Sequence, residues 1–146
     1  MKLREIDKSI THWLGHYGII ALRFSFAIIF IWFGFLKVIS YSPAIELVTQ
    51  TVYWFNPVWF VPFLGWWEMV IGACFLYRPL IRVGILLLIP QMIGTFLPLV
   101  LLPEITFQSG SFLLPTLEGQ YILKNLIIIA GAMAIGATVR QRHEGF

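Results

Sequence analysis

Long apolar runs alternate with short polar segments along the chain, and the lengths of the runs are the first guide to structure. The run 59–77 (WFVPFLGWWEMVIGACFLY) holds 19 residues with a single acid, Glu68, near its middle. A helix of about 20 apolar residues crosses the hydrocarbon core of a bilayer. Three further runs have comparable length and composition: about 18–39, 80–102 and 120–139. The pattern predicts an all-α fold, a transmembrane four-helix bundle in one domain that covers residues 1–146.

Two segments outside the runs carry helical patterns of their own. Ser42 followed by Pro43 is typical of a helix N-terminus, with serine as the N-cap and proline at the first helical position. Apolar residues then recur at helical spacing as far as Asn56-Pro57, which should stop the helix. We expect a short amphipathic surface helix at about 43–55, lying on the mouth of the bundle. Residues 1–17 show a similar periodicity, which predicts an interfacial turn or two.

Composition and charge narrow the class of protein. Hydrophobic residues make up 59% of the chain and charged residues 12%, which is not the composition of a soluble domain. The net charge of +3 does not indicate nucleic-acid binding, because the basic residues stand at the ends of the apolar runs and form no stripe. Seven of the ten lie near the N-terminus, in the 78–82 turn or in the tail from 140. This distribution predicts a multi-pass protein with both termini cytoplasmic.

Several kinds of cofactor site are excluded by residue type. Cys74 is the only cysteine, so the chain has no internal disulfide and no Cys-x-x-Cys pair. No histidine falls in an apolar run, which excludes a haem held by two intramembrane histidines. His12 and His16 have the i, i+4 spacing of metal ligands but no evident third ligand, so we predict no metal site. We therefore expect no covalent cofactor.

Glu68 is the residue around which the predicted bundle is organised. A carboxylate in hydrocarbon is costly, so it should face protein and have a partner. Gly65 and Gly72 lie at i−3 and i+4 from Glu68 and share its helix face. Because that face is nearly bare of side chains, a neighbouring helix should come close to the carboxylate.

Polar residues of the other runs are the candidate partners of Glu68. With both termini cytoplasmic, five of them share the outer half of the bundle with Glu68: Lys37, Gln91, Gln120, Lys124 and Asn125. Arg23, two heptads before Lys37, should also face inward but on the cytoplasmic side. One interpretation is a polar pocket that opens outward and binds an anionic or quinone-like head group. The alternative is a structural network, in which Glu68 pairs with Lys37 or Lys124 while Gln91 and Asn125 form interhelical hydrogen bonds.

The order of these residues resembles a known family. Arg23…Gly34-x-x-Lys37, Glu68-x-x-x-Gly72, Arg82 and the lysine of the last run are similar to motifs of the DoxX-like family of small four-helix membrane proteins. The segment 118–125 (EGQYILKN) resembles a variant found in one branch of that family. The resemblance extends over about Leu22–Gly136.

The resemblance implies a bundle in a bacterial-type cytoplasmic membrane. Some members of the family are subunits of a quinone-reducing thiosulfate oxidoreductase, others are tied to oxidative-stress resistance, and distant relatives are assembly chaperones. It favours a quinone- or lipid-binding membrane subunit that supports a redox role, with a quinone as the candidate cofactor. The candidate partners are membrane lipids, a redox partner protein and a second copy of the chain. The competing hypothesis is a non-enzymatic scaffold, assembly protein or small-anion binder.

Overall fold

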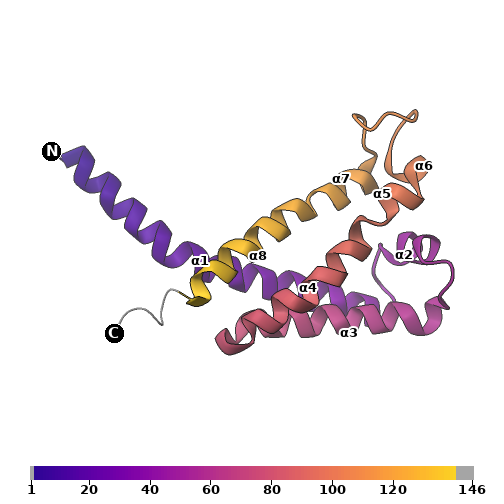
Figure 1. Ribbon diagram of the computed structural model, residues 1–146, viewed down its shortest axis with the longest axis horizontal. Coiled ribbons are helices and arrows are strands. Elements are labelled where there is room, and N and C mark those ends of the chain that lie inside the picture. Colours follow the sequence, from indigo (N-terminus) through magenta and orange to yellow (C-terminus); the bar gives the residue numbers. More distant parts are fainter. Residues whose placement is uncertain (1, 141–146) are drawn as a thin grey trace.

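The computed structural model describes residues 2–140 and consists of helices joined by short turns (Figure 1). Four segments are long and apolar enough to cross a membrane. They are α1 (Lys2–Val38), α3 (Pro57–Leu76), the segment Arg78–Leu101 and the segment Leu117–Val139. The predicted all-α bundle of four spanning helices is confirmed, and the chain is a multi-pass membrane protein.

The first helix is longer than the predicted span 18–39. The expected interfacial turns are not a separate element, because α1 runs without interruption from Lys2. Its N-terminal part projects away from the other helices (Figure 1). Ile6, Ile10 and Trp13 are exposed there. The periodicity of residues 1–17 was therefore a correct indication of helix, and the prediction of a separate piece was wrong.

A left-handed residue closes α1. Ser40 has φ +62°, the Tyr41 N–H donates to Leu36 O at 2.9 Å, and the Ser40 N–H donates to Lys37 O at 3.2 Å. These are the paired bonds of a Schellman motif, in which glycine is the preferred left-handed residue. The motif turns the chain from α1 toward α2.

We expect Ser40→Gly to stabilise the protein by about 1 kcal/mol, because glycine adopts positive φ without the steric cost that serine carries. Unfolding in detergent by titrated dodecyl sulfate measures the change. Ser42→Gly is the control: Ser42 Oγ accepts the Ala44 N–H at 3.2 Å, so its loss should be neutral or unfavourable. Equal effects of the two substitutions would contradict the argument.

The most extensive helix–helix contact is between α1 and α3, and glycines allow these two helices to come close. A Cβ atom on Gly34 would collide with Gly65 O, and one on Gly65 would collide with Gly34 O. A Cβ on Gly72 would lie 2.8 Å from the Ile31 side chain and 3.0 Å from Ala27 O. The prediction that a neighbouring helix comes close to the Gly65–Gly72 face of the Glu68 helix is confirmed, and that helix is α1.

The surface helix is present but shorter than predicted. The expected range was 43–55, whereas α2 spans Ile45–Thr51 and its N-cap position is Ala44. Asn56-Pro57 does not act as the stop for this helix. Instead, Asn56 is the N-cap of α3, with its side chain accepting the Val58 N–H at 3.0 Å and Pro57 at the first helical position. The same dipeptide suits either end of a helix, and here it begins the next one.

The third and fourth spanning segments are interrupted. The third consists of the 3₁₀ turn η1 (Arg78–Leu80), α4 (Ile81–Phe96) and α5 (Pro98–Leu101), with Pro90 inside α4. The helix is interrupted at Leu97 although Leu97 keeps helical dihedral angles, because Pro98 has no N–H to continue the hydrogen-bond pattern. After α6 (Pro103–Thr106), the fourth segment consists of α7 (Leu117–Leu123) and α8 (Asn125–Arg140), which are separated at Lys124. The predicted bounds were 80–102 and 120–139, so the break at Lys124 is the feature that the sequence pattern did not indicate.

The apolar core lies between these segments. Phe26, Phe30, Ile71 and Phe75 join α1 to α3, and the rings of Phe26 and Phe75 lie 4.9 Å apart between centroids. Ile81, Leu88, Met92, Ala132 and Ile135 add α4 and α8 to the same cluster. The cluster thus joins all four spanning segments.

Candidate ligand-binding site

Lys37, Glu68 and Gln91 form a buried polar cluster that joins three helices. Lys37 Nζ lies 2.6 Å from Glu68 Oε2, and Gln91 Nε2 donates to Glu68 Oε1 at 2.6 Å. Glu68 is 6% exposed and Lys37 is 8% exposed. Each carboxylate oxygen therefore has a donor, one charged and one neutral, supplied by α1 and α4 respectively.

The close approach of α1 and α3 explains how the ion pair forms. Lys37 lies three residues after Gly34 on α1, and Glu68 lies three residues after Gly65 on α3. A Cβ on Gly65 would lie 3.0 Å from Lys37 Cβ, so the backbone of α3 at Gly65 is almost in contact with the lysine. The glycine contact and the ion pair are parts of one interface.

A cavity of about 590 Å³ lies beside this polar cluster. Lys37, Glu68 and Gln91 are among its lining residues, and so is Asn125. Most of the other lining residues are apolar, from α1, α2, α3, α4, α7 and α8, with Phe33, Val48 and Phe63 as examples. α2 thus forms part of the cavity wall, which agrees with its predicted place at the bundle mouth. The cavity is largely apolar with a charged group at one point.

The cavity also has rigid walls. Trp67, next to Glu68, lines it and donates from Nε1 to Leu87 O at 3.2 Å, which fixes the indole between α3 and α4. Thr51 and Thr95 line it too, but their hydroxyl groups donate to carbonyl oxygens of their own helices, Leu47 O and Gln91 O. The sequence analysis did not single out these three as wall residues. For Trp67 the available signal was its place beside Glu68.

The fourth spanning segment contributes less than expected. Asn125 lines the cavity, but its amide donates to Tyr121 O at 3.2 Å and Ile122 O at 3.0 Å, at the end of α7. Gln120 and Lys124 are exposed and are not among the cavity-lining residues. Of the two lysines considered as partners for Glu68, the structure pairs Lys37 and leaves Lys124 outside the cluster. The structure therefore does not bring Lys124 or Gln120 to Glu68.

Arg23 faces inward as predicted and contacts the C-terminal end of α3. Its Nε donates to Phe75 O at 3.1 Å and its Nη2 donates to Leu76 O at 3.0 Å. Carbonyl groups in the last turn of a helix have no intrahelical partner. A basic side chain also interacts favourably with the negative end of the helix dipole. Arg23 thus caps α3 and is not part of the cavity.

What the cluster can do chemically follows from its remaining hydrogen-bonding capacity. A lysine ammonium has three N–H bonds, and the one described partner of Lys37 is Glu68. Further N–H bonds therefore remain for a carbonyl or anionic oxygen in the cavity. Among the described residues 2–140, no group of three or more His, Cys, Asp or Glu residues is placed to hold a metal ion.

Comparison of the chain with protein-family models, with curated proteins and with solved structures gave no match. The function therefore has to be inferred from the geometry of the cavity and the cluster.

Proposed function

We propose that the protein binds a quinone, or a lipid with a similarly polar head and apolar body, in the cavity beside Lys37, Glu68 and Gln91. The observation that carries the proposal is a cavity of about 590 Å³ with mostly apolar walls and one buried ion pair. Ligand pockets typically measure about 300–1,000 Å³ and combine apolar walls with a few fixed polar groups. A ring or acyl chain would contact the apolar walls, and an oxygen of the head group would accept from Lys37.

The resemblance to the DoxX-like family supports a role in a redox system or in oxidative-stress resistance. Since the chain has a single cysteine and no histidine in an apolar run, electrons would come from a partner protein or from the reduced, quinol form of the bound molecule. The resemblance also supports a location in a bacterial-type cytoplasmic membrane, and the distribution of the basic residues supports an orientation with both termini cytoplasmic.

One observation favours a second candidate, a scaffold without a ligand. Both oxygens of Glu68 already have donors, so the cluster is complete as an interhelical clamp. In that case the cavity would be a packing defect or an interface for a partner membrane protein, and turnover would not be expected.

Native mass spectrometry of gently solubilised protein separates the two candidates. Val48→Trp on α2 fills the cavity without touching the ion pair, while Gln50→Trp adds the same side chain to an exposed position of the same helix. We expect the wild type and Gln50→Trp to carry a quinone or lipid and Val48→Trp to lose it. The mass of the bound molecule, and its ultraviolet absorbance after extraction from the protein, distinguish a quinone from a lipid. Empty wild-type protein that gains no quinone on addition would favour the scaffold.

A further inference from the structure

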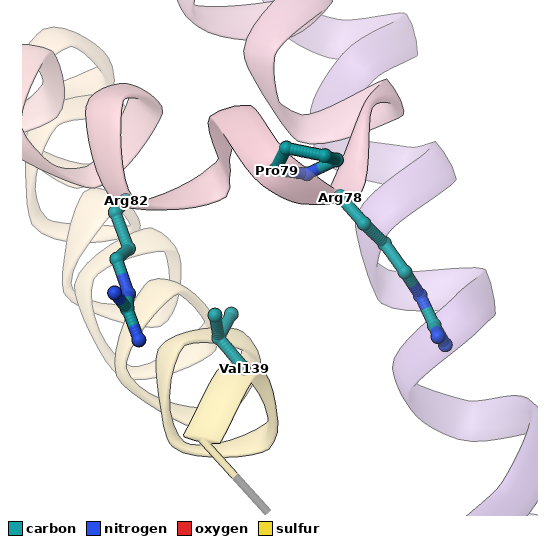
Figure 2. Close-up of a pocket in the computed structure, with 4 residues that line it drawn as sticks. All are labelled: Arg78, Pro79, Arg82 and Val139. Carbon is teal, nitrogen blue, oxygen red and sulfur yellow. The ribbon is translucent and has the colours of Figure 1, made fainter. Parts of the chain in front are cut away.

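A second hollow lies at the other end of the bundle, away from the Glu68 cavity. It has a volume of about 310 Å³ and is lined by Arg78, Pro79, Arg82 and Val139. It lies between the turn that joins α3 to α4 and the end of α8. Figure 2 shows the Arg78 side chain extending from that turn and the Arg82 side chain from the first turn of α4, on either side of Val139 in this view.

Among the residues that the structure describes, neither arginine has an acidic ion-pair partner. Both are exposed, and the one ion pair in the described part of the chain is Lys37–Glu68. Arg23, at the neighbouring end of α3, adds a third guanidinium that is already bonded to backbone carbonyls. The hollow is therefore strongly positive and has two guanidinium groups available for an anion.

The ends of the spanning segments place the hollow at the level of the lipid head groups. Arg78 follows the spanning helix Pro57–Leu76 and begins the span Arg78–Leu101, and Val139 ends the span Leu117–Val139. Three membrane-spanning segments thus end at this level. Spanning helices end where hydrocarbon gives way to head groups, so the hollow lies at the depth of lipid phosphates.

We propose that this hollow binds the phosphate group of an anionic phospholipid. Guanidinium groups bind phosphate oxygens through paired, charge-assisted hydrogen bonds. Pro79 and Val139 offer apolar contact to the glycerol and the first acyl carbons, and Leu80 and Val83, which are exposed at the start of the third segment, add apolar surface for the acyl chains. A soluble phosphate compound shares the head-group chemistry but would gain nothing from that surface, which is why we commit to a lipid. The proposal is independent of the function proposed for the Glu68 cavity.

The test compares retention of phosphatidylglycerol with retention of phosphatidylcholine by native mass spectrometry of the full chain. The site variant is Arg78→Gln/Arg82→Gln. The control Arg4→Gln/Lys8→Gln removes the same charge from exposed positions on the projecting part of α1. We expect the wild type and the control to prefer phosphatidylglycerol, and the site variant to bind it about tenfold more weakly, the equivalent of one lost charge-assisted pair.

A second variant keeps both arginines. Val139→Trp fills the hollow and should also weaken phosphatidylglycerol binding, with a melting temperature in detergent that shows the protein is folded. The proposal is overturned if the site variant and the control lose the lipid equally, if neither loses it, or if the wild type shows no preference. Displacement of the lipid by millimolar inorganic phosphate would assign the hollow to a soluble phosphate compound and overturn the lipid assignment.

Discussion

Replacing Lys37 with methionine is expected to destabilise the protein by about 3–5 kcal/mol, because it leaves the Glu68 carboxylate buried without its cation. Gln91 would remain as a donor to one oxygen, but a neutral amide compensates only part of the missing charge. Methionine keeps nearly the volume of the lysine stem, so the loss reports on charge rather than on a cavity. Unfolding by dodecyl sulfate titration in mixed micelles gives the change.

The reverse substitution, Glu68→Gln, should cost less. Lys37 is the penultimate residue of α1, and its long side chain can extend to the membrane interface once its partner is gone. Glu68 is near the middle of α3 and has no such route. We therefore expect Lys37→Met to be the less stable of the two single variants, because Glu68 is buried deeper in the membrane than Lys37. A Glu68→Gln variant less stable than Lys37→Met would contradict this reasoning.

The double variant Lys37→Met/Glu68→Gln completes a thermodynamic cycle. Because it removes both charges, it should be more stable than Lys37→Met alone, with a coupling energy of about 1–3 kcal/mol. Lys124→Met is the matched control, since Lys124 is exposed and outside the cluster, and its effect should stay within about 0.5 kcal/mol. Additive single effects would mean that the ion pair contributes nothing specific to the fold.

Residue spacing along α3 alone was enough to predict which face of this helix meets its neighbour. Gly65, Glu68 and Gly72 share a face by helical periodicity alone, and a bare face around a buried acid requires a close neighbour. The same periodicity placed Arg23 and Lys37 on the inner side of α1, where the structure has Lys37 bonded to the middle of α3 and Arg23 bonded to its C-terminal end. These features depend on a single helix and its immediate neighbour.

The choice between the two lysines could not be made in that way. It depends on which face the fourth segment turns toward the other helices, and the spacing within one segment does not determine that face. Asn125, which suggested interhelical bonding, donates instead to the Tyr121 and Ile122 carbonyl oxygens in the last turn of α7. A side chain that satisfies its own backbone is indistinguishable in sequence from one that faces a partner.

The cavity was predicted only as an outward-facing polar pocket. Its size depends on how far α2, α4 and α7 stand from α1 and α3, and helix separation is not encoded in the period of one helix. Prolines interrupt or kink a helix, and Pro90 and Pro98 of the third segment both line the cavity. Where the kinked segment would leave space could be learned only from the packed structure.

Substituting Gly65 with alanine should destabilise the protein by about 1–3 kcal/mol, even though alanine is the better helix former. The new Cβ would collide with Gly34 O and would lie 2.9 Å from the Val38 side chain, so α1 and α3 would have to separate. Backbone atoms on the opposing helix cannot move aside as a flexible side chain can. The separation would also lengthen the Lys37–Glu68 contact, so the substitution weakens the ion pair indirectly.

Gly94→Ala provides the control for this effect. Gly94 lies within α4, in a membrane-spanning segment, and a Cβ there would meet no atom within 4 Å. Helix propensity then acts alone, and the substitution should be neutral or slightly stabilising. The two alanine variants are thus expected to differ in sign under identical unfolding conditions. If Gly65→Ala also proved neutral, α1 and α3 would not be in the close contact that brings Lys37 to Glu68.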